Sequence, residues 1–258
     1  MWQTLRSELH PLGVEIVTVS LELGSAEESR PFIEAADPQH PSLLDPEHQL
    51  DALFGVVNIP NVIWINEDGV IVRPAEPGWP GTTQMPGEFV ARMMKQREAD
   101  ASAAPTSDDG QPKGPNLMRL LQGGQDRQTY ADAIRDWADR GSDSPYAMDP
   151  DEVMAASQPR SMDQSRGAAH FELANHFWQA GDRASAIVHF NECHRLQPEN
   201  WTYKRQAWSL FGRERVPGDV GVFLQNPVAG QEADWPFVSS FDADVARLEP
   251  GQYYPKTI

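Results

Sequence analysis

The sequence predicts an α/β domain followed by an α-helical domain. A first observation is the run GVVNIPNVIWINEDGVIVR at residues 55–73, which combines a proline, an uncharged hydrophobic stretch and a tight turn, as a β-hairpin does. A second is the spacing of apolar residues over positions 166–195, which is typical of two helices separated by Gly181 and Asp182. A third is the stretch between them, EADASAAPTSDDGQPKGP at 98–115, which has too little apolar bulk to form a core.

These observations define the expected organisation of the chain, which has four parts. We expect an α/β domain at residues 1–97, a flexible linker at 98–115, a helical domain at 116–215 and an irregular tail at 216–258 that packs on the rest.

Composition excludes several classes of function. The 258-residue chain carries a formal net charge of −17, which argues against a nucleic acid or an anionic membrane as partner. We find no apolar run near the ~20 residues that cross a bilayer and no signal peptide, so the sequence as written predicts a cytoplasmic protein without a membrane segment. Cys193 is the single cysteine, so the chain has no internal disulfide, no Cys-x-x-Cys pair and no multi-cysteine zinc site, and we expect no cofactor.

The first elements follow from apolar spacing and from helix-capping residues. Trp2, Leu5 and Leu9 have the spacing of the last turns of a helix, and residues 14–20 alternate like a strand. A helix is expected at 25–36, with Ser25 as its cap.

The next helix is predicted from its own start and stop signals. Asp45 can cap it, Pro46 suits its first position, and Gly55 ends it. The apolar face that we expect to be inward consists of Leu50, Leu53 and Phe54.

The hairpin is the most informative part of this half. Residues 61–66 and 70–73 are expected to be its strands, and a connection as short as 67–69 makes them antiparallel. Pro60 lacks an N–H, so it belongs at the start of the first strand, and Ile59 before it is expected to be extended. A loop over 74–87 and a helix over 88–96 follow.

In order and spacing, the segments at 13–22, 25–36, 41–56 and 55–73 are similar to the thioredoxin-like superfamily, in its TlpA/ResA and peroxiredoxin-like branch. The resemblance covers about the first third of the chain. It implies a thioredoxin fold and thiol–disulfide oxidoreductase or peroxide-reducing chemistry, with a disulfide or peroxide as substrate. Ile59 and Pro60 would be the cis-proline loop that binds substrate.

The resemblance also implies a central strand and a Cys-x-x-Cys motif that would both precede Met1, so no catalytic residue is assigned within this chain. One alternative is that the protein starts further upstream, for example because an active-site selenocysteine codon was read as a stop; an export signal or membrane anchor could then precede the domain as well. The other is a degenerate, non-catalytic domain. We favour the first, because sheets rarely survive the loss of a central strand.

In the second half, a helix is expected at 128–140 through Tyr130, Ile134 and Trp137. The two helices expected over 166–195, together with the residues just after them, resemble a tetratricopeptide repeat. His170 stands in place of the first aromatic residue of the repeat. The matching positions are Leu173, Ala174, Phe177, Gly181, Ala186, Phe190, Cys193 and Pro198. A following helix is expected at 201–211, and the alternative function is a non-enzymatic scaffold whose repeat binds a protein partner.

The second helix of this pair carries three residues of metal-ligand type. His189, Cys193 and His194 have spacings that could suggest ligands. However, Cys193 stands where the repeat requires a small core residue and His194 points elsewhere, so no metal is predicted.

Overall fold

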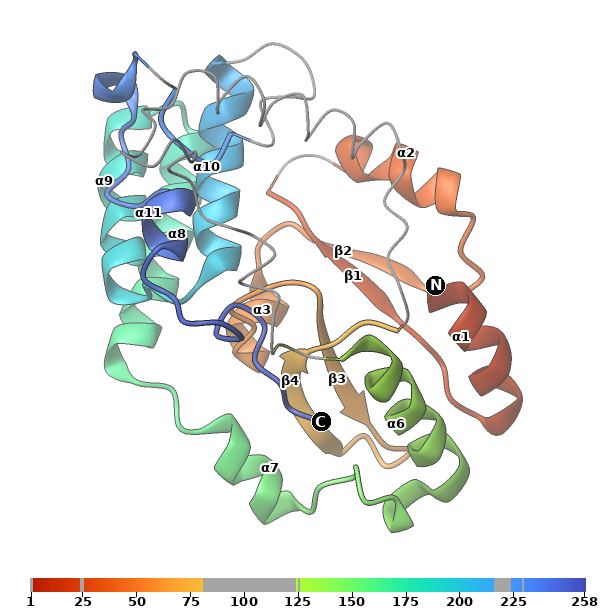
Figure 1. Ribbon diagram of the computed structural model, residues 1–258. Coiled ribbons are helices and arrows are strands. Elements are labelled where there is room, and N and C mark those ends of the chain that lie inside the picture. The colour runs from red at the N-terminus through yellow and green to blue at the C-terminus, as the bar shows by residue number, and fades with distance from the viewer. Residues whose placement is uncertain (1, 24–25, 81–123, 125, 216–223, 229) are drawn as a thin grey trace, which may run out of the picture.

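The computed structural model describes residues 2–23, 26–80, 124, 126–215, 224–228 and 230–258. The described chain is mixed α/β: helices α8 to α10 form one side of the molecule, and two small sheets with helices α1, α2 and α6 form the other (Figure 1). The predicted linker at 98–115, the predicted helix at 88–96 and the predicted cap Ser25 all lie outside the described residues.

The first sheet is a parallel pair. Strand β1 (Thr18–Leu21) pairs with β2 (Ser42–Asp45), with Thr18 opposite Ser42 and Leu21 opposite Asp45. Helix α2 (Ala26–Ala36) connects the two strands, as parallel pairing requires. Strand β1 begins later than the strand expected over 14–20, and β2 was not predicted.

The helix after β2 begins later than expected, so Pro46 lies before it and not at its first position, and it buries a different face. It is the short helix α3 (Gln49–Phe54), and Gly55 ends it with a φ of 73°, as predicted. The Asp45 carboxylate accepts hydrogen bonds from the N–H groups of Gln49 and Leu50. Asp45 therefore caps the helix as expected, but it lies further along the chain from the first helical residue than predicted. Leu53, expected to be inward, is 74% exposed, because Asp51 occupies the buried face instead.

The predicted hairpin is confirmed. Strands β3 (Asn61–Ile65) and β4 (Ile71–Pro77) are antiparallel, and the Asn66 side chain accepts hydrogen bonds from the N–H groups of Asp68 and Val70 in the turn. Strand β4 extends through part of the predicted loop at 74–87. One reason is that Arg73 and Glu76 form a buried ion pair, with Nε and Oε1 2.7 Å apart, which fixes this part of the strand.

The α/β region has its own hydrophobic core. Helix α1 (Trp2–Leu9) and helix α6 (Arg127–Arg140) pack against β3, and Trp64 Nε1 donates to the Tyr130 hydroxyl at 3.0 Å. The fully buried members of this cluster include Leu5, Leu9, Trp64, Tyr130, Ala133 and Ile134. The sequence assigned the helix at 128–140 to the second domain, whereas its buried face belongs to the first core.

The helical region follows the predicted pattern. Helix α7 (Pro150–Ser157) leads to α8 (Met162–Gln179) and α9 (Arg183–Leu196), which are joined at Gly181 with a φ of 84°. Helix α10 (Trp201–Arg215) packs next to them, with Ala207 and Trp208 fully buried. Short 3-10 turns occur at His10–Leu12, Gly141–Asp143 and Glu232–Asp234.

The C-terminal segment covers the helices. It contains α11 (Phe241–Val245), and its aromatic side chains join the core that α8, α9 and α10 form. These side chains are Trp235, Phe237, Phe241, Tyr253 and Tyr254. The described parts of the tail therefore pack on the helical core.

Candidate functional site

The loop at 55–60 connects α3 to β3. Gly55 takes the left-handed conformation that lets the chain leave α3, and the Ile59–Pro60 peptide bond is cis, the geometry that the resemblance implies there. The Ile59 side chain is 41% exposed, and Pro60 is exposed as well. The end of the loop is therefore accessible to solvent.

The beginning of this loop is fixed by helix α10. The Val57 carbonyl accepts hydrogen bonds from the N–H groups of Trp201 at 2.7 Å and Thr202 at 3.2 Å. These donors belong to the first turn of α10, where backbone N–H groups lack partners within the helix. The Val57 carbonyl thus gives two N–H groups at the start of α10 a hydrogen-bond partner, and the same hydrogen bonds hold the loop in place.

Asn58 is a buried junction between three segments. Its Nδ2 donates to the Tyr253 carbonyl at 2.8 Å, and its Oδ1 accepts from Arg205 Nη1 at 2.8 Å. Burial lowers the pKa of the Arg205 guanidinium, although the neighbouring Tyr254 partly offsets this effect. The loop, α10 and the C-terminal tail therefore share one polar network.

Both backbone groups of Ile59 are engaged by this network. Its N–H donates to Asn58 Oδ1 at 3.0 Å, and its carbonyl accepts from the Tyr254 hydroxyl at 2.8 Å. Burial raises the pKa of Tyr254, so the hydroxyl remains a donor at neutral pH. Sequence reasoning missed Tyr254, Arg205 and Asn58, because the first two lie far from the loop in the chain and no local pattern marks the third.

The two sheets each offer a strand edge next to this region. In the part of the chain that the structure describes, β1 pairs with β2 alone and β3 pairs with β4 alone. Ile16, shortly before β1, packs in the same core as Val62 of β3 and Leu9 of α1. The segment before β1 and strand β3 therefore share a core, and β1 and β3 do not pair with each other.

The only cysteine is unsuited to catalysis. Cys193 is 0% exposed in α9, and burial raises the pKa of its thiol well above the ordinary range. A nucleophilic cysteine needs a thiolate and access to its substrate. The structure therefore places Cys193 in the helical core, and no catalytic thiol is present in the described chain.

A second buried pair, His48 and Asp51, lies between the two regions. Their Nδ1 and Oδ2 atoms are 2.7 Å apart, and the imidazole ring contacts Phe171 of α8 at 5.1 Å between centroids. Burial is the largest influence on Asp51 and raises the pKa of its carboxyl. With both side chains at most 1% exposed, the pair is inaccessible to a substrate and acts as a packing element.

The repeat-like positions occupy different environments. Ala174, Ala186, Phe190 and Cys193 are completely buried, and Phe177 is partly buried. By contrast, Leu173 is 44% exposed and Pro198 is exposed beyond the end of α9. The α8–α9 contact is thus made by the small and aromatic positions, while Leu173 faces solvent.

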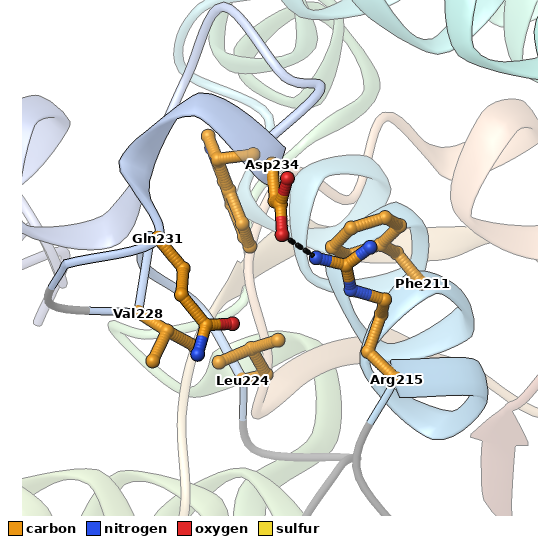
Figure 2. Close-up of a pocket in the computed structure, with 7 residues that line it drawn as sticks. Phe211, Arg215, Leu224, Val228, Gln231 and Asp234 are labelled. Atoms are coloured by element: carbon orange, nitrogen blue, oxygen red, sulfur yellow. Dashed lines mark hydrogen bonds and ion pairs between the residues drawn. The ribbon is translucent and has the colours of Figure 1, made fainter.

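A small cavity lies between α10 and the C-terminal segment (Figure 2). Its volume is about 60 Å³, whereas sites for drug-sized ligands hold ~300 to 1,000 Å³. An ion pair between Arg215 and Asp234 crosses it, with 2.5 Å between Nη2 and Oδ2. The remaining lining residues are Phe211, Leu224, Val228, Gln231 and Trp235. This cavity suits at most a few water molecules.

Among the residues that the structure describes, no group of three or more His, Cys, Asp or Glu side chains could hold a metal ion. His189, Cys193 and His194 in particular do not converge, because Cys193 and His194 are buried on one side of α9 and His189 meets His170 of α8. None of the described helices has the length and apolar character needed to span a bilayer.

Comparison of the chain with protein-family models, with curated proteins and with solved structures finds no match in any of the three.

Proposed function

We propose that the α/β region is the substrate-binding part of a thioredoxin-like protein of the redoxin kind, which acts on disulfides or peroxides. In this proposal, the loop at Ile59 and Pro60 holds the substrate. The nucleophilic thiol or selenol is carried by a segment that is not in this sequence. The proposal rests on the resemblance of residues 13–73 and on the arrangement of the strands.

The observation that carries the proposal is the pair of strand edges. Strand β1, helix α2 and the antiparallel strands β3 and β4 occur in the order that the resemblance implies, and among the described residues β1–β2 and β3–β4 are separate sheets. One added strand between β1 and β3 would join them into a single sheet and satisfy the backbone groups along both edges. In the resembling family, that strand leads into the helix that bears the catalytic thiol.

The chemistry then follows from the position of that helix. Helix α1 packs through Leu5 and Leu9 on Trp64 of β3, so a residue at the N-terminus of a longer α1 would be held by the same core as the hairpin. A thiolate or selenolate there attacks one sulfur of a disulfide and releases the other as a thiolate. A second thiol of the same motif then attacks the mixed disulfide, which frees the reduced product and leaves the motif oxidised.

The test compares the chain as written with an extended chain. The 258-residue protein should reduce neither insulin disulfides nor hydrogen peroxide above the rate of the reductant alone. The nucleotide sequence in frame before Met1 should encode a β-strand followed by a Cys-x-x-Cys motif or by a UGA codon in place of the first cysteine codon. A protein that includes this segment should be active, and replacing its first Cys or Sec with Ser should abolish turnover.

Two results would overturn the proposal. One is an upstream sequence with a ribosome-binding site and no such motif. The other is turnover by the chain as written that is lost in Cys193→Ser, because that result would make the buried thiol the nucleophile.

A second candidate function is a non-enzymatic scaffold, and exposed apolar residues on the repeat-like helices favour it. Leu173 on α8 and Val188 on α9 are 44% and 65% exposed, and a neighbouring repeat or a protein partner could cover them. An upstream sequence without a redox motif, together with an inactive chain, would favour this candidate.

A further inference from the structure

The backbone groups of the loop before β3 form hydrogen bonds within the chain. The Val57 carbonyl accepts from two N–H groups of α10. The Ile59 N–H donates to Asn58 Oδ1 at 3.0 Å, and the Ile59 carbonyl accepts from the Tyr254 hydroxyl at 2.8 Å. A peptide that adds to a chain as a strand pairs with the N–H and carbonyl groups of alternate residues. At Val57 the carbonyl, and at Ile59 both groups, are already used.

The Tyr254 hydroxyl is held in this position by the surroundings of its ring. The ring meets the edges of Trp79 and Tyr253, with 5.0 Å and 4.7 Å between the ring centroids. Tyr253 is 4% exposed and belongs to the helical core. Arg205 interacts with the Tyr254 side chain and also donates to Asn58 Oδ1 at 2.8 Å. The tail therefore presents the hydroxyl to the loop as part of a packed core.

The surface that the loop offers to a ligand is made of side chains. Ile59 is 41% exposed, and Pro60, which has no N–H, is exposed as well. A polypeptide laid against these side chains would lose water from its own N–H and carbonyl groups without gaining a hydrogen-bond partner at Ile59, which is unfavourable. A small molecule without a peptide backbone does not meet this obstacle. The loop thus favours small ligands over extended peptides.

We propose that Tyr254 is a specificity-determining residue, whose hydroxyl occupies the Ile59 carbonyl and so excludes extended polypeptides from the loop. Low-molecular-weight disulfides or peroxides are then the substrates. This inference rests on the redox function proposed above and selects among the substrates considered there. Tyr254 acts through the Ile59 carbonyl and takes no part in the chemical steps.

The first test measures peptide binding by the chain as written, which needs no catalytic thiol. The probe is the insulin B chain with carboxamidomethylated cysteines, added to the ¹⁵N-labelled 258-residue protein and followed by NMR. In the wild type, the amide resonances of Ile59 and Asn61 should not shift. In Tyr254→Phe they should shift and saturate, because the released carbonyl can accept a hydrogen bond from the peptide.

The matched control is Tyr253→Phe. It removes a hydroxyl from the adjacent ring of the tail and keeps both the Tyr254 hydroxyl and the Tyr253 carbonyl that Asn58 bonds. This variant should behave like the wild type. Saturable binding of the peptide at Ile59 in the wild type would overturn the proposal. Failure of Tyr254→Phe to bind the peptide would overturn it as well, since the hydroxyl would then not be what excludes polypeptides.

The second test uses the extended protein that contains the upstream redox motif. Tyr254→Phe should raise kcat/KM for insulin disulfides, relative to kcat/KM for bis(2-hydroxyethyl) disulfide, by roughly threefold or more through a lower KM for insulin. Damage to the fold would lower both values together, and an unchanged ratio would contradict the inference. If the extended protein is inactive, the redox function fails, whereas the peptide-binding experiment still decides the role of Tyr254.

Discussion

His194 is a buried titratable residue inside the helical core. Its Nδ1 lies 2.8 Å from the Ser239 hydroxyl. Burial, and then the nearby Lys204 ammonium, lowers the pKa of His194 to about 3, while a backbone hydrogen bond with Tyr203 opposes the shift. The folded protein therefore keeps this imidazole neutral under conditions in which an exposed imidazole is charged.

This pKa shift predicts a loss of stability in mild acid. In the unfolded chain His194 binds a proton near its ordinary pKa of 6.5, whereas in the folded chain it binds one only near 3. The unfolding free energy should therefore fall as the pH decreases from 6.5 towards 3, by up to ~1.4 kcal/mol per pH unit, and this contribution should be constant above 6.5. Urea denaturation at about pH 7 and about pH 5.5 measures the difference.

The comparison variant is His194→Gln, which does not titrate. The slope of its unfolding free energy against pH should be smaller than that of the wild type by an amount that corresponds to about one bound proton. This difference does not depend on the absolute stability of the variant. His176→Gln, which replaces an exposed histidine by the same amide, is the control. An equal slope in His194→Gln and the wild type would contradict the assignment.

Among the elements, the hairpin and the α8–α9 pair were predictable from sequence, since turn residues and apolar spacing act over a few positions. The position of α6 was not, because its apolar face could pack on either core. The structure places Tyr130 of α6 against the end of β4, where a Cβ on Gly78 would lie 2.4 Å from Tyr130 Cζ. This close approach exists only if α6 packs against the end of β4 as the structure shows.

We therefore expect Gly78→Ala to destabilise the protein by ~1 to 3 kcal/mol, because the fully buried Tyr130 ring has no room to move. Tyr130→Leu removes the ring atoms that the new methyl group would meet. The cost of the double variant should thus be smaller than the sum of the two single costs. Urea denaturation of the four proteins gives the interaction energy.

A control for this cycle is Gly69→Ala in the hairpin turn. A Cβ at Gly69 meets no atom within 4 Å, although its φ of 76° makes the substitution unfavourable. Its cost should add to that of Tyr130→Leu. If the costs of Gly78→Ala and Tyr130→Leu also add, then α6 does not pack on β4 as described.

At the scale of the whole molecule, the α/β core and the helical core are linked by His48 and by the C-terminal tail. His48, just before α3, contacts Phe171 and Tyr203 of the helical region. The C-terminal tail places Tyr253 in the helical core and Ile258 in the α/β core, and the Thr257 carbonyl accepts from Arg73 at 3.3 Å. The tail is therefore part of both cores.

This linkage predicts that removing residues 251–258 weakens both regions. Amide hydrogen exchange followed by mass spectrometry should show lower protection in β3 and in α8 together, since the truncation removes apolar contacts from each core. Lys256→Ala changes an exposed residue of the same tail and should leave protection unaltered. Loss of protection in only one of the two regions would show that the cores are independent.

The sequence by itself determined the class of elements, the hairpin that opens at Pro60, and the helix pair separated by Gly181, because these features depend on neighbouring residues. Only the tertiary structure decided that α6 belongs to the first core, that Tyr254 bonds the Ile59 carbonyl, and that His170 meets His189. These contacts join residues between 19 and 195 positions apart. They depend on how whole faces pack, which no local pattern of residues specifies.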